Sequence, residues 1–420
     1  MTASRRASLR DGIFKTSFAP GPERTRVGVE VELLAQDAAT GFPRPLLGNV
    51  HALVPLIRAY AVSAGWSERA GYGDVPYFDI PGRATISFEP GGQIEISTLP
   101  CDSVSDLVCS TQSVVAELAS LLGDAGVRLE SLGIDPLNDA RAIPLQLAAD
   151  RYETMTRYVE RIGPYGIRMM RQTAAIQVSL DRGPRPADRW RLLNDLAPYV
   201  VAVFANSRYY CGADTGHRSF RAHCWRQLDP SRTGVALPSD DPAGAYTDFA
   251  LSANDMFQSA DREHAVSFAD REDDGDFESA WQTHLTTLFP EVRPRGHYEV
   301  RSCDAIDPKW YAAPVVFLYG LAYDGESSRE AAQIAAGSAG LLEAAGERGL
   351  ENEALAANAR DLFQLALDGA RRLGAARVGP AEVDVAVEFY RTYTARGRSP
   401  ADDQPPPPPR LLNESKANIR

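Results

Sequence analysis

The sequence predicts an α+β fold built on a largely antiparallel sheet, with a helical region toward the C-terminal end. The expected strands and helices do not alternate regularly, which argues against a doubly wound parallel sheet. Two of the strands are separated only by Pro90-Gly91-Gly92, a tight turn of the kind that joins antiparallel neighbours. From about residue 308 to residue 396, alanine, leucine and charged residues dominate, as expected for packed helices.

Strands are expected where apolar and polar residues alternate, because successive side chains of a strand point to opposite faces. Such segments are residues 26–34, 84–89, 93–99, 127–133 and 173–180, and a further one surrounds Glu299. The segment 71–83 is rich in Gly, Tyr and Pro, so it is expected to form a mobile loop.

Helices are expected where apolar residues recur every three or four positions. They are residues 51–64, a segment from Asp102 or Ser103 to about Gly123, residues 150–162 and residues 188–205. Asp102 or Ser103 can supply an N-cap, and Gly163-Pro164-Tyr165-Gly166 is typical of a turn. Beyond residue 308 we expect three or four helices, broken near 346–349, 374 and 379–380.

The chain is therefore divided into four regions. Residues 1–24 form a lead-in, either frayed or a short helix, and residues 25–325 form the core that carries the chemistry. Residues 326–396 form the helical C-terminal region. Residues 397–420 form a polar tail with a polyproline run at 405–409, and this tail is expected to be disordered.

Composition excludes several classes of protein. The net charge of −12 over 420 residues argues against a nucleic-acid partner, and no apolar run is long enough for a membrane span. The five cysteines form no C-x-x-C pair, so free thiols in a reducing cytoplasm are expected. Neither a G-x-x-x-x-G-K-[ST] loop nor a dinucleotide G-x-G-x-x-G motif is present. A nucleotide enzyme built on this chain must therefore use another scaffold.

Acidic side chains recur on one face of the expected strands. Glu30 and Glu32 share a face opposite Val29 and Val31, and Glu95 has the same relation to its apolar neighbours. If the strands are neighbours, carboxylates crowd one surface and need divalent cations for neutralisation; all-oxygen ligands suit magnesium. The expected carboxylates are Glu30, Glu32, Glu89, Glu95 and Glu299. The pattern indicates an enzyme that handles a magnesium-bound nucleotide.

Several longer strings of residues resemble the glutamate–cysteine ligases, and especially the plant-type group that includes bacterial enzymes of ergothioneine synthesis. The resemblance spans roughly residues 25–325, and the helical end is only loosely similar. The matching strings are VGVEVELL (27–34), SFEPGGQIEIS (87–97), MMRQTAAIQVSL (169–180), VAVFANS (201–207), SFRAHCWRQLDPSRTG (219–234), HLTTLFPEVRPR (284–295) and EVRSCDA (299–305).

The resemblance implies a glutamine-synthetase-like fold in which a curved antiparallel sheet forms a funnel. Magnesium-ATP enters on one side, and glutamate and cysteine enter on the other. It implies metal-binding roles for the five carboxylates, with two or three Mg²⁺ ions, and a catalytic role for Arg301 at the transferring phosphoryl group. Arg221 and Trp225 are expected to bind the substrate glutamate, and Gln177 is expected to contact substrate or metal. Arg171 has the same strand parity as Gln177 and is expected to line the cleft.

Two other functions stay open at this point. A related carboxylate–amine ligase would keep glutamate activation but accept another amine, and the sequence does not place the amine pocket. A non-catalytic homologue is a third hypothesis, although an intact set of costly carboxylates argues against it. Taken singly, an E-x-E pair on a strand is more often a solvated face. The downstream pathway and the oligomeric state are not predicted.

Overall fold

The structure is a computed structural model that describes residues 1–234, 239–272 and 275–407. Within these residues, nine strands form one sheet in which every pairing is antiparallel. The strand order is β10-β11-β7-β1-β5-β4-β3-β2, and β6 pairs with the far end of β1. This arrangement confirms the predicted antiparallel α+β architecture.

The strands of the main sheet are β1 (Val27–Asp37), β2 (Ser67–Tyr72), β3 (Val75–Ile80), β4 (Ala84–Phe88), β5 (Ile94–Thr98), β6 (Val127–Glu130), β7 (Ala175–Asp181), β10 (Val292–Pro294) and β11 (His297–Asp304). A separate two-stranded hairpin consists of β8 (Tyr209–Tyr210) and β9 (Ala213–Asp214).

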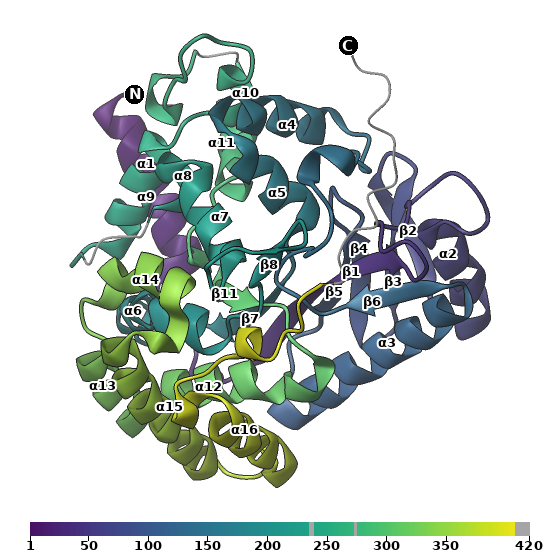
Figure 1. Cartoon of the computed structure of the whole chain (residues 1–420). Coiled ribbons are helices and arrows are strands. Elements are labelled where there is room, and N and C mark those ends of the chain that lie inside the picture. Colours follow the sequence, from purple (N-terminus) through teal and green to yellow (C-terminus); the bar gives the residue numbers. More distant parts are fainter. Residues whose placement is uncertain (235–238, 273–274, 408–420) are drawn as a thin grey trace.

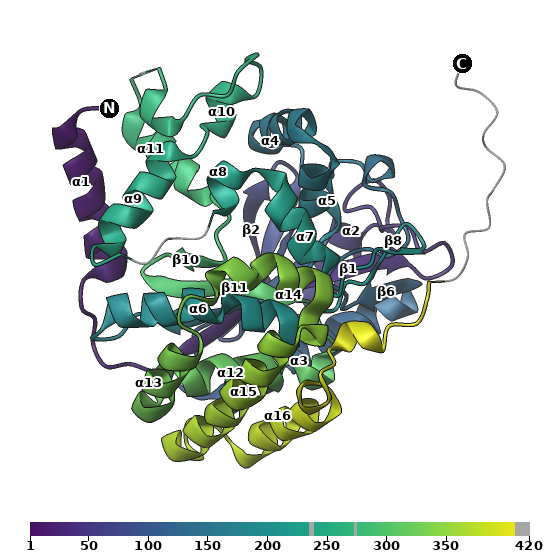
Figure 2. The same cartoon turned by 60° about the vertical axis from the view of Figure 1, so that its left-hand side comes forward.

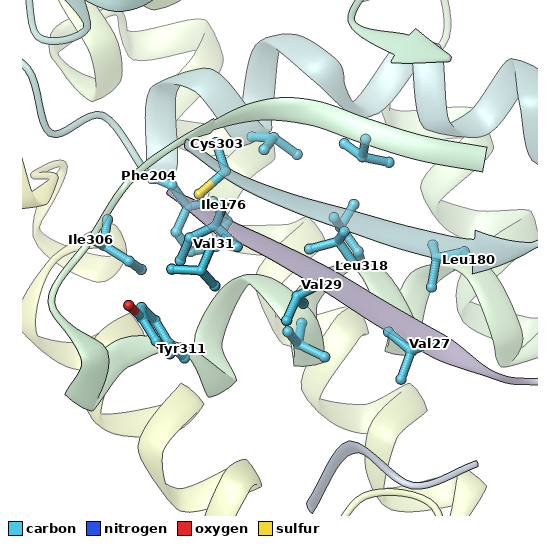
Figure 3. Close-up of a cluster of buried hydrophobic side chains, with 14 of the residues drawn as sticks. Val27, Val29, Val31, Ile176, Leu180, Phe204, Cys303, Ile306, Tyr311 and Leu318 are labelled. Atoms are coloured by element: carbon cyan, nitrogen blue, oxygen red, sulfur yellow. The ribbon is translucent and has the colours of Figure 1, made fainter. Parts of the chain in front are cut away.

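The apolar face of the sheet packs on helices α3 (Val104–Asp124), α6 (Pro186–Val203) and α12 (Ala312–Tyr323). Figure 3 shows Val29 and Val31 of β1 beside Ile176 of β7, with Leu318 of α12 in the same cluster. Burying these side chains away from water is the main favourable contribution to folding, at about 25 cal/mol per Å² of apolar surface.

A second layer of helices continues this core outward (Figure 1). It consists of α13 (Gly325–Ile334), α14 (Leu342–Arg348), α15 (Glu353–Leu373) and α16 (Pro380–Thr392). Helix α12 contacts both α15 and α16, and one continuous set of buried residues runs from the sheet into these helices. The C-terminal region therefore buttresses the strands that carry the acidic side chains.

Other helices lie over the opposite, polar face of the sheet (Figures 1 and 2). They include α4 (Asp150–Ile162), α5 (Pro164–Gln172) and α7 (Phe220–Leu228). The remaining helices are α1 (Ala3–Ile13), α2 (Leu53–Ala64), α8 (Pro230–Thr233), α9 (Pro242–Ser252), α10 (Met256–Ser259) and α11 (Phe277–Thr286). None of the helices in the described part of the chain is long and apolar enough to cross a membrane.

Three sequence predictions need correction. The expected loop at 71–83 is mostly strand: β2 and β3 form a hairpin, and Val75, Phe78 and Ile80 are buried. The hairpin closes tightly because Gly71 has no side chain; a Cβ there would lie 2.3 Å from the carbonyl oxygen of Val75. The turn expected at 163–166 is instead the start of α5, with Pro164 in its first turn, where proline costs no hydrogen bond.

The third correction concerns the C-terminal tail, whereas the lead-in takes one of its two expected forms, a short helix. The lead-in is helical over Ala3–Ile13 and is joined to α9 by ion pairs from Arg6 to Asp248 and from Arg10 to Asp241. The tail begins later than residue 397, because Gln404 donates hydrogen bonds to Asn206 and the amide of Ala401 donates to the carbonyl of Ala205. Residues 408–420, with the last two prolines of the run 405–409, lie outside the described residues.

Candidate active site

Acidic side chains from three segments meet on the polar face of the sheet. In the register of β1 with its neighbours, Glu32 lies opposite Glu95 of β5, and Glu30 lies opposite Gln177 of β7. Glu89 follows directly after β4. These four glutamates line one cavity of about 310 Å³. This volume is at the small end of the range typical of ligand pockets.

The cavity also contains most of the other predicted residues. Gln177, Arg221, Trp225 and Arg301 line it. The structure therefore brings together eight of the ten predicted site residues. The two that it places elsewhere are Arg171 and Glu299.

Arg171 lies outside this cavity. It belongs to the last turn of α5, so the strand parity that linked it to Gln177 does not extend to it. Its guanidinium donates to the carbonyl of Ile143 at 2.8 Å, and the residue borders a separate small void beside Gly91. Its placement indicates support of the Gly91 turn in place of the predicted contact with substrate.

Glu299 is fully buried behind the cavity wall among arginines. Its carboxylate pairs with Arg301 at 2.8 Å, Arg293 at 3.2 Å and Arg295 at 3.4 Å. Burial alone would raise its pKa, but these guanidiniums outweigh burial and lower the pKa of Glu299 to about 2. A carboxylate so occupied is a poor metal ligand in this arrangement, so its metal-binding role stays a prediction that the geometry does not support.

The tight turn after β4 fixes Glu89. The amide of Gly91 donates to the side chain of Gln93, which in turn donates to the carbonyl of Thr173. Gln146 donates to the carbonyl of Gly91 from the outside. A Cβ on Gly91 would lie 2.0 Å from the carbonyl oxygen of Arg171, so only glycine fits between the turn and α5.

Burial and the closeness of other carboxylates disfavour the charged forms of Glu30, Glu32 and Glu89. Burial and the neighbouring Glu95 raise the pKa of Glu30 to about 8, with Glu299 adding to the effect, and raise that of Glu32 to about 7. Burial, followed by the charges of the other glutamates, also raises the pKa of Glu89 well above its ordinary value. Unless a cation neutralises them, these carboxylates therefore bind protons near neutral pH, as expected for buried carboxylates that lie close together.

The hydrogen bonds of these carboxylates differ. Glu95 accepts from Ser87 at 2.7 Å and from Ser97 at 3.3 Å, and Glu32 accepts from Gln177 at 2.9 Å. Nothing in the described residues donates a side-chain hydrogen bond to the carboxylates of Glu30 or Glu89. Free carboxylate oxygens facing one cavity are the donor set that Mg²⁺ prefers.

As they are placed, however, the carboxylates do not form a closed metal cage. No three His, Cys, Asp or Glu side chains among the described residues converge closely enough to hold a metal ion. Mg²⁺ rarely uses such cages, since it keeps several waters and is usually held by one or two carboxylates together with substrate phosphates. The residues present fit that mode of binding.

Helix α7 presents a cation and an aromatic ring one turn apart. Ser219 caps the helix by accepting from the amide of Ala222, and Arg221 and Trp225 then project on the same side. The guanidinium carbon of Arg221 lies 4.9 Å from the Trp225 ring centroid. Arg221 also donates to the carbonyl of Arg301 at 2.9 Å, which ties α7 to β11.

Asp304 supports this arrangement from behind. The buried carboxylate accepts from the hydroxyls of Ser207 and Ser219 and lies 3.7 Å from Arg221. Arg301, the predicted catalytic residue, donates to both Glu299 and Gln177. Both guanidiniums are thus fixed before any ligand binds, which is the preorganisation that phosphoryl transfer requires.

Part of the cavity wall comes from residues that no sequence pattern indicated. Helix α4 contributes Arg151, Tyr152 and Met155, and the β2–β3 hairpin contributes Tyr72. Arg293 and Arg295 also line the cavity. No motif marks the α4 residues, and the only available signal was the amphipathic pattern of the helix.

A second cavity of about 250 Å³ adjoins the first on the same face of the sheet. Glu30 lines both cavities and therefore stands at their junction. The remainder of the second cavity includes Arg26, Gly28, Ser97, Thr98, Ser179, Asp181 and His297.

Comparison with known proteins places this geometry in a family. The family model described as "Glutamate-cysteine ligase family 2 (GCS2)" matches residues 26–403. Glutamate–cysteine ligase EgtA of Mycolicibacterium smegmatis is 32% identical over 395 residues, covering 90% of this chain and 86% of that protein. A chloroplastic glutamate–cysteine ligase of Nicotiana tabacum is 30% identical over 330 residues, covering 74% of this chain and 62% of that protein.

A solved structure shares the fold. Glutamate–cysteine ligase of Francisella tularensis, crystallised in complex with AMP, superposes with a TM-score of 0.58 at 13% identity, over 92% of this chain and 84% of that one. At this identity the likeness concerns the fold alone. It agrees with the antiparallel sheet and helical C-terminal region described above.

Proposed function

The chain belongs to glutamate–cysteine ligase family 2, and from this premise we propose that it joins the γ-carboxylate of glutamate to the amine of L-cysteine at the expense of ATP. The single observation that carries the proposal is the cavity in which Glu30, Glu32, Glu89 and Glu95 meet Arg301. Such a site suits phosphoryl transfer, which needs positioning and charge neutralisation more than a protein nucleophile.

We assign the metal-binding role to the four glutamates of the cavity. The raised pKa values of Glu30, Glu32 and Glu89 and the unpaired carboxylates of Glu30 and Glu89 support this assignment, and two or three Mg²⁺ ions fit the number of carboxylates. When bound, Mg²⁺ neutralises charge on the nucleotide phosphates and can contribute several kcal/mol to transition-state stabilisation. Glu95 and Glu32, opposed across β1 and β5, form the centre of the set.

We assign the nucleotide to the second cavity. Its phosphates then enter the first cavity past Glu30, the residue that both cavities share. Arg293, Arg295 and Arg301 line the first cavity, and Glu299 pairs with all three guanidiniums. In this role the buried Glu299 positions the arginines that face the phosphates.

Glutamate is placed by Arg221, Trp225 and Gln177. The guanidinium of Arg221 suits the α-carboxylate, because planar donors bind carboxylates with two parallel hydrogen bonds. The γ-carboxylate attacks the terminal phosphorus of ATP; ADP leaves, and an acyl phosphate forms on glutamate. The cysteine amine then attacks the acyl carbon, loses a proton and expels phosphate. Arg301 holds the transferring phosphoryl group during the first step.

One assay tests the proposal. ADP release is measured with Mg²⁺, ATP and glutamate, first with cysteine and then with other amines. Turnover with cysteine supports the proposed ligation, and turnover only with another amine identifies a related carboxylate–amine ligase. Absence of both turnover and nucleotide binding would refute an enzymatic role and favour a non-catalytic homologue.

A further inference from the structure

One guanidinium in the wall of the cavity, that of Arg151, forms no hydrogen bond or ion pair with the described residues; its contact is with the Tyr152 ring, whose centroid lies 6.0 Å away. Arg151 lies in the first turn of α4 and lines the cavity of the four glutamates. Its Nε is buried without a hydrogen bond, and no described residue forms an ion pair with its guanidinium. A buried donor without a partner costs about 1–3 kcal/mol, so a ligand that supplies an acceptor gains affinity.

The Nε atoms of Arg221, Arg293 and Arg301 also lack a hydrogen bond, but these arginines differ from Arg151 because each has an ion pair. Arg301 and Arg293 are paired with Glu299, and Arg221 donates to the carbonyl of Arg301 beside Asp304. Their guanidiniums are held by the protein before a substrate arrives. Among the arginines that line the cavity, Arg151 is therefore the one that forms no ion pair with the described residues.

The surroundings of Arg151 are aromatic and apolar. The rings of Tyr72 and Tyr152 meet edge to face with centroids 5.0 Å apart, and Met155 lies one turn along α4. Burial and then the charge of Glu89 raise the pKa of Tyr152, which shows that this wall stands near the glutamates. A ligand here meets a cation, a soft thioether and aromatic rings together.

One anionic group of the three substrates has no arginine assigned to it in the proposed function. In the proposed function, the ATP phosphates face the arginines around Glu299, and the glutamate α-carboxylate faces Arg221. The remaining anion is the α-carboxylate of the amine acceptor. We propose that Arg151 binds this carboxylate and thereby selects an α-amino acid as acceptor, with its side chain against Met155 and Tyr152. The inference rests on the proposed function and names the acceptor subsite of the same cavity.

The experiment compares cysteine with cysteamine, which keeps the thiol and amine but lacks the carboxylate. Wild-type enzyme and the Arg151→Met variant are assayed for kcat/KM with each acceptor at saturating ATP and glutamate. We expect the variant to lose cysteine kcat/KM by roughly 10- to 100-fold, the effect of one charged hydrogen-bonded contact. Its kcat/KM for cysteamine should change less than about threefold, since that acceptor makes no such contact.

A matched control lies on the same helix. Arg157 is exposed, pairs with Asp261 and faces away from the cavity, so Arg157→Met should leave both acceptors unchanged. Should Arg151→Met fail to fold, Arg151→Lys is assayed with the same two acceptors. Lysine keeps the charge but lacks the planar guanidinium, so the ratio of kcat/KM for cysteine to that for cysteamine should fall.

Three results would overturn the inference. The first is that the folded Arg151 variants keep the wild-type ratio of kcat/KM for cysteine to kcat/KM for cysteamine. The second is that the wild-type enzyme does not prefer cysteine, and the third is that the defect of the variant lies in the KM for ATP or glutamate. Failure of the proposed function would look different, because the wild-type enzyme would then release no ADP with either acceptor.

Discussion

Replacing Glu95 by Gln separates two effects of the acidic cluster: its charge repulsion, which destabilises the folded protein, and its contribution to turnover. The substitution keeps the shape of the side chain, and the amide oxygen can still accept from Ser87 and Ser97. It removes one charge from a group in which Glu95 contributes to the raised pKa of Glu30, Glu32 and Glu89. We therefore expect the variant to gain stability without metal and to lose activity.

The register of β1 and β5 gives the magnitude. Glu32 and Glu95 are directly opposed, a position where Cβ atoms lie about 5 Å apart. Two full charges at about 5 Å repel by about 3 kcal/mol at an effective dielectric constant near 20. Since the pKa of Glu32 is about 7 and that of Glu30 is about 8, protons relieve part of this repulsion at neutral pH. In Glu95→Gln, the free energy of unfolding without metal should therefore rise by roughly 1 kcal/mol at pH 7, and by close to the full repulsion of about 3 kcal/mol near pH 9.

The sign of the pH dependence follows from the same shifts. The ordinary pKa of these groups is 4.5, so between about 4.5 and 8 the folded chain binds protons that the unfolded chain has released. Their contribution to metal-free stability therefore falls as pH rises through this window. Glu95→Gln should weaken that fall. Turnover should drop by at least about 100-fold, because several kcal/mol of metal-assisted stabilisation are at stake.

The assay pairs thermal unfolding in EDTA at pH 6, 7 and 9 with ADP release in Mg²⁺. A gain of 1 kcal/mol corresponds to roughly 1–2 °C in Tm for a chain of this length. Glu388→Gln, an exposed carboxylate on α16 away from the cavity, serves as the control and should change neither quantity. Near-wild-type turnover of Glu95→Gln, or a lower Tm at pH 9 in EDTA, would refute the reasoning.

Two further predictions concern the metal and the turn. Mg²⁺ affinity should increase as pH rises from about 6 to 9, because Glu30 and Glu32 must lose protons before they bind a cation. Calorimetry in buffers of different ionisation enthalpy should show that protons are released on binding. An affinity that does not depend on pH would contradict the assignment of these glutamates as metal ligands. Gly91→Ala should destabilise the fold by about 1–3 kcal/mol and impair turnover, because the new Cβ meets the Arg171 carbonyl and displaces Glu89. Denaturant unfolding and ADP release are measured for Gly91→Ala and for a control, Gly12→Ala. Gly12 has open space around it in α1, so its substitution should stabilise the fold slightly. Equal stability and turnover of the two variants would show that the turn does not fix Glu89.

The sequence by itself determined the local content of the site. Strict alternation around Glu30, Glu32 and Glu95 predicted their shared face, since a strand has a period of two and the apolar partners must be buried. The Pro-Gly-Gly turn predicted the β4–β5 hairpin in the same way. These features depend on neighbours in sequence, so local patterns suffice.

Tertiary structure alone decided which elements complete the site. Strand parity misplaced Arg171 because the chain is helical there, and it could not reveal that Glu299 faces three arginines. Arg151 has no motif, and its role as cavity wall depends on how α4 lies over the sheet. Packing between elements distant in sequence sets these contacts, and it depends on the complementarity of whole surfaces that no short segment specifies.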